Sequence, residues 1–372
     1  MDHPSAPPSG PQEQSANEAP QATPPAHQTF TIGTRSSQLA MLQTSIVTTA
    51  LHAAHPTTTF AIESMQTLGD KDKQTPLHQF NAKALWTHEL EALLIAGTLD
   101  MIVHSMKDVP TQLPVECQLG AILQREDPRD AVVMRRFDPD TSSSRLKPNP
   151  TWQSLADLPP GTLVGTGSVR RQAQIASRYP HLRFRDVRGN VPTRLEKLDR
   201  PEKHGIAAGD QVACTILAVA GLKRLGLEER VMQYLSSDKE SGAGCLHAVG
   251  QGAIAIETRL GDERTLELLR TLDHAPTSLA CLAERSLMRT LEGGCSVPIG
   301  VETQWVDKGS LKMIGRVVAL DGSRDALRTL TAPVTSPKEA GEFGLKMARA
   351  LIEEGAQEIL KEINLNRAII NA

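Results

Sequence analysis

The residues best suited to chemistry lie between Gly165 and Arg194, where the sequence has seven arginines, no lysine and a single acid. The arginines are Arg170, Arg171, Arg178, Arg183, Arg185, Arg188 and Arg194. The run VGTGSVRRQAQIA predicts a strand, a turn and a helix capped by Ser168, with Arg170 and Arg171 in its first turn. Because a cation there opposes the helix dipole by about 0.3–1 kcal/mol, the pair indicates a bound carboxylate or phosphate. A solvated basic face is the alternative.

A second group of polar residues follows the predicted strand DMIV, in the run HSMKDVP. Ser105, Lys107 and Asp108 are expected at the carboxyl end of this strand, where open α/β sheets bind their ligands. Neighbouring side chains diverge in an extended loop, so Asp108 would face the ligand alone. A lone carboxylate among cations can hold a proton for a leaving group or stabilise a cationic intermediate. An ordinary surface Lys-Asp pair is the alternative.

A third candidate is Cys295, in the run LEGGCSVP. Gly293 and Gly294 end a predicted helix just before it and leave space around the thiol. Such a cysteine can be a nucleophile or a covalent attachment point. A buried packing role is the alternative, and no histidine stands near Cys295 in the sequence to support a hydrolase.

The elements that position these residues repeat. TFTIGTRSSQLAMLQTSIVTTALHAAHP predicts a strand, a turn holding Arg35 and a helix that ends before Pro56. Leu39, Leu42 and Ile46 form the apolar face of this helix. Two strand-turn-helix units of one design predict two related lobes, each directing a helix N-terminus and arginine at a cleft.

The rest of the chain divides around these units. Residues 29 to about 124 alternate strands and helices, as in a mainly parallel sheet, and residues 67–83 suggest a mobile loop over a site. A second lobe begins near residue 130, with surface insertions at 137–150 and 201–211, and the strand GAIAIETRL follows a glycine hinge at 250–252.

The C-terminal part has a different character. A helix over PTSLACLAERSLMRTLEGG precedes two strands, LKMIGRVVAL and ALRTLTAP, and one long helix closes the chain from about Pro337. This order predicts a small α+β domain with an antiparallel sheet.

Composition limits the class of protein. The chain has 372 residues, 40% hydrophobic content and a net charge of −3, which allow two or three domains and give no general attraction to nucleic acid. Residues 1–28 are rich in Pro, Ala, Gln and Ser, so we expect a disordered extension without a targeting signal. No run is apolar enough for a membrane span. Five dispersed cysteines suggest reduced thiols, a cytoplasmic location and no zinc site.

Seven motifs in order resemble those of the porphobilinogen deaminase (hydroxymethylbilane synthase) family: GTRSSQLA, VHSMKDVPT, GTGSVRR, RGNVPTRLEKLD, ILAVAGLKRLG, AVGQGA and EGGCSVPIG. They extend over nearly the whole chain from Thr29 to the last helix. Agreement at one motif would carry little weight, whereas agreement at all seven is highly specific.

The resemblance implies two α/β domains similar to type-II periplasmic binding proteins and a small C-terminal α+β domain. Domain 1 would comprise residues 29–124 and about 252–272, domain 2 residues 125–251 with insertions near 137–151 and 200–210, and domain 3 residues 273–372 with Cys295. A monomer is expected, with no nucleic-acid or membrane partner.

The resemblance also implies a transferase of tetrapyrrole and heme biosynthesis. A dipyrromethane cofactor would be held by a thioether to Cys295, and four porphobilinogen molecules would be added before water releases hydroxymethylbilane. Asp108 would assist the loss of ammonia. The positions that match cofactor- and substrate-binding residues are Arg35, Ser37, Ser105, Lys107, Thr166, Ser168, Arg170, Arg171, Arg188, Asn190, Arg194 and Arg224.

The residue types fit this chemistry independently. Each porphobilinogen carries two carboxylates, so a growing chain needs a dense bed of arginines, and the azafulvene left by ammonia is a cation that a carboxylate would stabilise. The sequence departs from the family pattern at Gly167, where a serine is usual, and at Ser36, often lysine. A two-lobed anion-binding protein without catalysis and a cysteine-dependent hydrolase are the alternatives.

Overall fold

The computed structural model describes Met1 and residues 29–67, 87–136, 151–291 and 297–370, the last of these with side chains as far as residue 363. Four predictions lie largely or wholly outside the described residues. They are the disordered extension 1–28, the loop over residues 67–83, the insertion near 137–151 and the attachment residue Cys295.

The first lobe is built on a five-stranded sheet in the order β2-β1-β3-β10-β4. Its strands are β1 (Thr29–Arg35), β2 (Thr59–Met65), β3 (Met101–Ser105), β4 (Cys117–Ile122) and β10 (Ile254–Arg259). Strand β1 is parallel to β2 and β3, whereas β10 is antiparallel to both β3 and β4. The prediction of a mainly parallel sheet is confirmed, because β1, β2, β3 and β4 all run in one direction and β10 alone, which returns from the second lobe between β3 and β4, runs in the opposite one.

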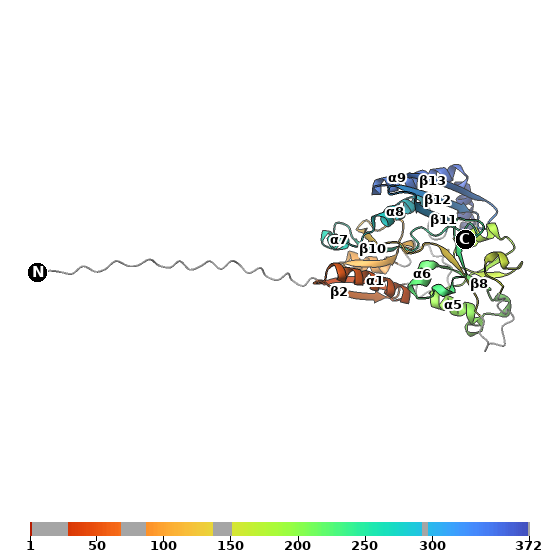
Figure 1. Cartoon of the computed structure of the whole chain (residues 1–372), viewed down its shortest axis with the longest axis horizontal. Helices are drawn as coiled ribbons and strands as arrows, with labels where there is room; N and C mark the ends of the chain where they lie inside the picture. The colour runs from red at the N-terminus through yellow and green to blue at the C-terminus, as the bar shows by residue number, and fades with distance from the viewer. Residues whose placement is uncertain (2–28, 68–86, 137–150, 292–296, 371–372) are drawn as a thin grey trace.

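The second lobe repeats this plan in the order β7-β6-β8-β5-β9. Its strands are β5 (Asp130–Met134), β6 (Leu163–Gly165), β7 (Arg183–Arg185), β8 (Cys214–Ala218) and β9 (Gln233–Leu235). Strand β6 is parallel to β7 and β8, and β5 is antiparallel to β8 and β9. In each sheet the fourth strand follows a crossing from the other lobe, as expected of two periplasmic-binding-protein-like lobes joined by two crossovers (Figure 1).

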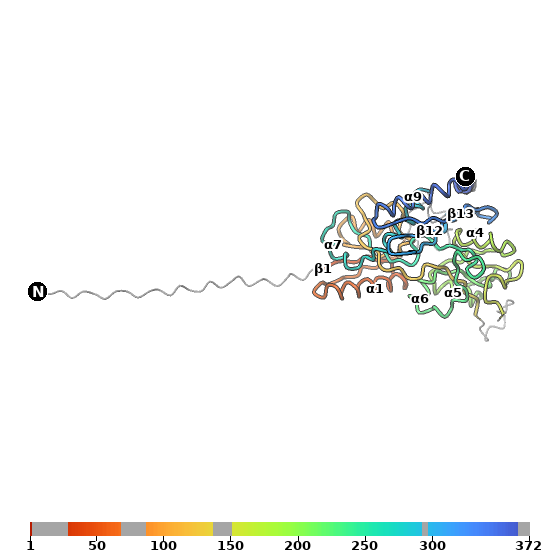
Figure 2. The backbone as a smooth tube through the Cα atoms, turned by 45° about the horizontal axis from the view of Figure 1, so that its top comes forward, coloured from red at the N-terminus to blue at the C-terminus, as the bar shows by residue number. Residues whose placement is uncertain are grey.

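Helices cover these sheets. They are α1 (Gln38–Ala54), α3 (His88–Ile95), α4 (Val169–Arg178), α5 (Val191–Asp199), α6 (Val219–Arg224) and α7 (Glu263–Leu269). Helices α1 and α6 contact each other and lie side by side where the lobes meet (Figures 1 and 2).

The buried face of α1 differs from the predicted one. Val47 and Leu51 are fully buried and pack in one core cluster with Phe30 of β1, whereas Ile46 is 43% exposed. Leu39 is only partly buried and lies on the side of α6. The predicted apolar stripe was therefore wrong, because α1 buries one face against its own sheet and turns another toward the second lobe.

The third domain is an antiparallel sheet in the order β11-β12-β13 packed against helices. Its elements are α8 (Ala275–Thr290), β11 (Ile299–Trp305), β12 (Ser310–Val318), β13 (Asp325–Pro333), α9 (Pro337–Glu353) and α10 (Ala356–Ile370). The predicted α+β character is confirmed. Strand β11 was missed, and the single closing helix is divided at Gly355, whose φ of 95° interrupts the helical backbone.

The third domain lies above both lobes in Figure 1. Within the described residues, no helix combines the length and apolar composition needed to cross a membrane.

Candidate active site

Asp108 lies beside an arginine of the neighbouring strand. Strands β1 and β3 are parallel neighbours, so their carboxyl ends meet at one edge of the sheet. Arg35 ends β1, and Asp108 ends the 3-10 turn η2 (Met106–Asp108) that follows β3. Arg35 Nη1 is 3.9 Å from Asp108 Oδ2. Ser105 is held at the same edge, because Gln43 Nε2 of α1 donates to its Oγ at 2.8 Å.

Lys107 has a different partner from Asp108. Its Nζ donates to Oε1 of Gln251 at 3.3 Å. Burial lowers the pKa of Lys107 to about 8, with the Asp108 charge opposing that shift. The two neighbours thus contact different partners, and they lie in a 3-10 turn and not in the extended loop that the sequence reasoning assumed.

In the second lobe, Arg170 and Arg171 lie in the first turn of α4, which Ser168 caps by accepting from Arg171 N at 3.4 Å. Both arginines are buried, and their guanidiniums converge on Asp130 at the start of β5. Arg170 Nη2 is 2.7 Å from Oδ2 and Arg171 Nη2 is 2.6 Å from Oδ1. The sequence predicted an anion at this helix terminus, and the chain itself supplies one.

Asp130 was missed by sequence reasoning because its partners are distant in the chain. Burial raises its pKa, but the charges of Arg170 and Arg171 outweigh burial and hold the pKa well below its ordinary range. Arg171 Nη1 donates to the Ile216 carbonyl at 2.7 Å, while its buried Nε has no hydrogen-bond partner among the described residues. Two guanidiniums against one carboxylate leave a net positive charge and a free donor.

Arg188 and Arg194 flank the start of α5. Asn190 caps this helix by accepting from Thr193 N at 2.9 Å. Arg188 Nε donates to Asp186 Oδ2 at 2.7 Å, and Arg194 Nε donates to the Gly189 carbonyl at 2.7 Å.

Charges from both lobes act on Arg194. Burial, followed by repulsion from Arg171, lowers its pKa to about 10, and Arg188 acts in the same direction. Asp108 of the first lobe opposes this shift. Arg194 therefore lies within electrostatic reach of Arg171 and Arg188 in its own lobe and of Asp108 in the first lobe.

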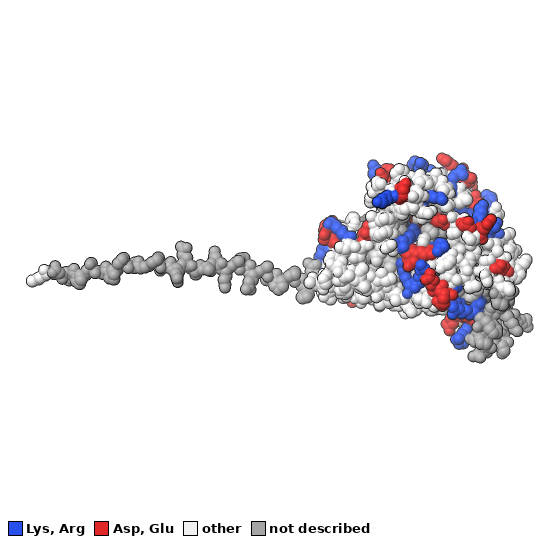
Figure 3. Space-filling view, in the orientation of Figure 1, with Lys and Arg blue, Asp and Glu red and all other residues white. Residues whose placement is uncertain are grey.

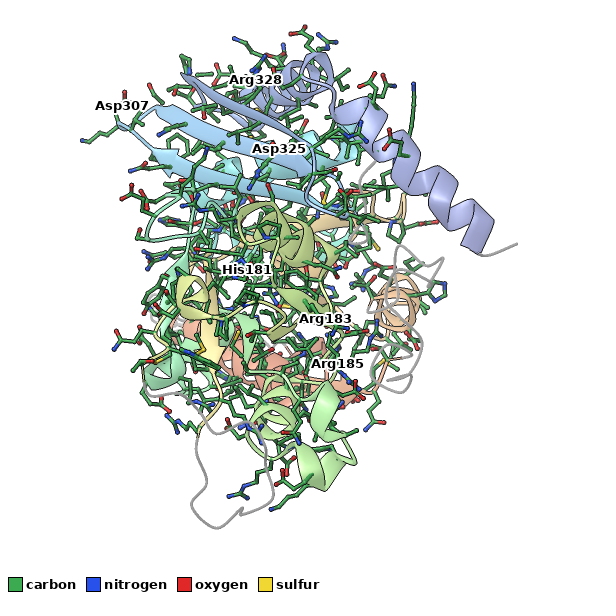
Figure 4. The ribbon with its side chains drawn as sticks, turned by 90° about the vertical axis from the view of Figure 1, so that its right-hand side faces the viewer. His181, Arg183, Arg185, Asp307, Asp325 and Arg328 are labelled. Atoms are coloured by element: carbon green, nitrogen blue, oxygen red, sulfur yellow. The ribbon has the colours of Figure 1, made fainter. Side chains whose placement is uncertain are left out.

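The other members of the arginine-rich segment lie elsewhere. Arg178 and Arg183 are exposed, and Arg185 pairs with Asp210 at 2.5 Å. Arg183 and Arg185 belong to β7, an edge strand of the second sheet (Figure 4). The density of arginine therefore combines site residues with surface residues.

Thr166 and Gly167 shape the turn before α4. Thr166 Oγ1 accepts from Ser168 N at 3.2 Å. A Cβ at residue 167 would lie 2.6 Å from Asp186 Oδ1, so glycine gives this carboxylate room beside the turn. Ser37 has the role of Ser168 in the first lobe, since its side chain caps α1.

Gln251 connects the lobes at the second crossover. Its Nε2 donates to Asp130 Oδ1 at 2.8 Å and to the Pro128 carbonyl at 2.7 Å, while its Oε1 accepts from Lys107. The adjacent Gly252 has a φ of 90°, and a Cβ there would collide with the Glu126 carbonyl of the first crossover. Sequence reasoning placed a hinge here but missed the amide between its two glycines.

Helix α6 holds both crossovers. Arg224 Nη2 donates to the Gly252 carbonyl at 2.7 Å, and Lys223 Nζ contacts Glu126 Oε1 at 3.1 Å. Figure 3 shows acidic and basic side chains gathered over this part of the surface. The predicted binding residue Arg224 is thus engaged with the hinge backbone.

Glu284 of α8 ties the crossovers to the third domain. Its carboxylate accepts from Arg125 at 2.6 and 3.0 Å and from Gly250 N at 2.8 Å. Burial raises the pKa of Glu284, but the Arg125 charge outweighs it and the net shift is downward. The helix that carries Glu284 leads toward residues 292–296, where Cys295 lies outside the described residues.

The other cysteines are unsuited to nucleophilic chemistry. Cys117, Cys214, Cys245 and Cys281 are buried and free, and burial is the main cause that raises the pKa of each to about 12. Thiols with such pKa values stay protonated at neutral pH.

Comparisons with known proteins agree with this arrangement. A family profile described as "Porphobilinogen deaminase, dipyromethane cofactor binding domain" matches residues 30–267. A second, "Porphobilinogen deaminase, C-terminal domain", matches residues 278–353.

Curated relatives are similar along most of the chain. Porphobilinogen deaminase of Neurospora crassa is 47% identical over 92% of this chain and 96% of its own length. The enzyme of Yarrowia lipolytica is 46% identical over 90% of this chain and 93% of its own length. That of a Synechococcus strain is 46% identical over 89% and 95%.

Solved structures overlap less closely. The periplasmic aliphatic sulphonate binding protein SsuA from Escherichia coli has a TM-score of 0.34 at 11% identity, covering 72% of this chain and 71% of its own. The BenM effector binding domain with benzoate has a TM-score of 0.35 at 16% identity, covering 66% and 90%. The family profiles and the relatives carry the assignment, and the chain belongs to the porphobilinogen deaminase family.

Proposed function

We propose that the cationic site between the lobes binds the acidic side chains of cofactor and substrate, with Asp108 as its catalytic carboxylate and Cys295 as its covalent anchor. As a member of this family the chain is a transferase of tetrapyrrole and heme biosynthesis. It condenses four porphobilinogen molecules in steps, releases hydroxymethylbilane and uses a dipyrromethane cofactor. The assignment of roles to individual residues is our proposal.

The donor set suits a polycarboxylate. Guanidiniums present paired N–H groups that match carboxylate oxygens. Arg35 of the first lobe lies 3.9 Å from Asp108, and the charge of Asp108 also acts on Arg194 of the second lobe. The buried Nε of Arg171 lacks a partner among the described residues, although a buried donor is normally hydrogen-bonded. These observations fit a site that binds an acidic ligand.

The cofactor, when bound, supplies the pyrrole carbon to which the first substrate unit is joined. The protein's own residues must bind and orient the substrate and assist its loss of ammonia. We infer that Arg35, Arg170, Arg171, Arg188, Arg194 and Arg224 bind acetate and propionate groups or shape the site that does so. Ser37, Ser105, Lys107, Thr166, Ser168 and Asn190 then order the turns and helix ends that present these arginines.

Asp108 has the placement that proton transfer requires. Its side chain is 33% exposed, so substrate can reach it, and Arg35 lies 3.9 Å away. We propose that Asp108 supports the departure of ammonia and stabilises the positive charge that develops on the pyrrole. The approach of Arg35 to Asp108, together with the action of the Asp108 charge on Arg194 of the second lobe, is the observation that carries this proposal.

Intact mass is the decisive experiment. We expect the purified chain to be heavier than its sequence by one dipyrromethane, and Cys295→Ser to lose both the added mass and the activity. Asp108→Asn should keep the added mass and the fold but lose most of kcat. An unmodified chain with full activity would refute the role of Cys295, and an unchanged kcat in Asp108→Asn would remove Asp108 from the mechanism.

A two-lobed anion-binding protein without catalysis shares the arginines but has no need of Cys295. The intact mass separates these functions. We also propose the division into three domains with the boundaries given above, a monomeric state, a cytoplasmic location, and the absence of nucleic-acid and membrane partners. Light scattering at several protein concentrations tests the monomer.

A further inference from the structure

Two residues of α8 contact the turn that carries Asp108. Cys281 is fully buried in a small apolar cluster that includes Met106 and Val109, the residues on either side of Lys107 and Asp108. Arg285 follows Cys281 by four residues, so it lies on the same face of the helix. The third domain therefore reaches the catalytic turn of the first lobe by an apolar contact and a polar one.

The polar contact is made to backbone carbonyls alone. Arg285 Nη1 donates to the Val109 carbonyl at 3.0 Å, and Nη2 donates to the Pro110 carbonyl. The side chain is 7% exposed, and no carboxylate among the described residues lies within ion-pair distance of it. Burial lowers its pKa to about 10.

A buried cation without a counter-ion costs free energy, so Arg285 is a poor choice for stability alone. A packed apolar side chain would fill the same space at lower cost. The benefit of a buried arginine must therefore come from the backbone segment that its hydrogen bonds to the Val109 and Pro110 carbonyls hold in place.

The segment that Arg285 contacts, Val109 and Pro110, has a restricted backbone and follows directly after Asp108. Val109 N donates to the Met106 carbonyl and closes η2, and Pro110 restricts Val109 to extended backbone, observed at φ −76° and ψ 124°. Only one residue separates Asp108 from Pro110. Fixing both carbonyls therefore fixes the direction in which the Asp108 side chain leaves the turn.

We propose that Arg285 is a positioning residue that sets the place of the Asp108 carboxylate relative to α8, and thereby relative to the cofactor anchored beyond the end of that helix. This inference rests on the roles proposed for Asp108 and Cys295. It concerns geometry, so removing Arg285 should slow the chemical step more than it weakens substrate binding.

The test compares holoenzymes that all carry the cofactor mass. Arg285→Met keeps the apolar stem and removes both hydrogen bonds. We expect kcat to fall on the order of 10- to 100-fold, as for a reacting group displaced by about 1 Å, with KM changed much less. Arg285→Lys keeps a positive charge and hydrogen-bond donors but loses the planar guanidinium geometry, so its kcat should lie between those of Arg285→Met and the parent. Arg289→Met is the matched control, since Arg289 is exposed one turn further along α8, and it should keep normal kcat.

A double-mutant cycle with Asp108→Asn separates positioning from general destabilisation. If Arg285 acts through Asp108, adding Arg285→Met to Asp108→Asn should reduce kcat little further. Losses that multiply, a normal kcat in Arg285→Met, or a rise in KM alone would each overturn the inference. If Asp108→Asn itself retains full kcat, the proposed function fails first, and that result is read independently of Arg285.

Discussion

Replacing Asp130 by asparagine tests the charge arrangement at the base of the site. The substitution keeps the shape of the side chain but removes the only carboxylate within ion-pair distance of Arg170 and Arg171 among the described residues. Asp130 is fully buried, and its oxygens lie 2.7 and 2.6 Å from the two guanidiniums. Breaking a buried pair of this kind costs about 3–5 kcal/mol, because the cations remain without compensation.

Calorimetry of the holoenzyme measures the effect. At about 2 °C per kcal/mol for a large chain, we expect Tm to fall by roughly 5–10 °C. Inorganic phosphate should raise the Tm of Asp130→Asn more than that of the parent, because the uncovered guanidiniums gain an anion.

Asp325→Asn is the matched control for Asp130→Asn. Asp325 also forms an ion pair with an arginine, Arg316, at 2.7 Å, but it is 35% exposed on the third domain (Figure 4). A partly exposed pair contributes about 0–1 kcal/mol. If Asp130→Asn lowers Tm no more than Asp325→Asn, the reasoning about buried charge is refuted.

Four further outcomes are expected. Burial lowers the pKa of Lys107 to about 8, so kcat/KM should fall as pH rises through that value. Lys107→Arg stays charged and should move this fall to higher pH. A fall of kcat/KM at the same pH in both proteins would contradict this. By linkage the depressed pKa makes folding stability rise, not fall, between about pH 8 and the ordinary lysine pKa. Gly167→Ser should displace the Asp186 carboxylate from Arg188, which frees that guanidinium for substrate and lowers KM about two- to fivefold. Asp186→Ala should lower KM in the same way. A higher KM in both variants would contradict this reasoning. Arg171→Leu should reduce the fraction of chains that carry the cofactor mass, and full loading would count against its assigned role.

Much of the local structure followed from the sequence. The cap Ser168 and the arginines in the turn after it depend on residues within one helical turn, so the pattern was sufficient. The prediction of the buried face of α1 was wrong because the polar residues Gln43 and Thr44 are buried, and Gln43 forms a hydrogen bond with Ser105. Apolar periodicity cannot mark a face whose buried residues are polar.

The missed residues depend on contacts that no local pattern records. Asp130 is 40 and 41 residues from its two arginines, and Gln251 is 144 residues from Lys107. Arg285 is 176 residues from Val109. Strand β11 was missed because its pairing depends on β12 and its own sequence contains Gly300 and Glu302. These assignments required the three-dimensional fold.

The placement of Asp130 has a consequence for folding. Two guanidiniums buried side by side without a carboxylate would repel each other and resist compaction. The carboxylate of Asp130 offsets that repulsion and still leaves the buried Nε of Arg171 without a partner among the described residues. The chain can thus bury these two arginines without an outside anion, because their counter-charge folds into place with them.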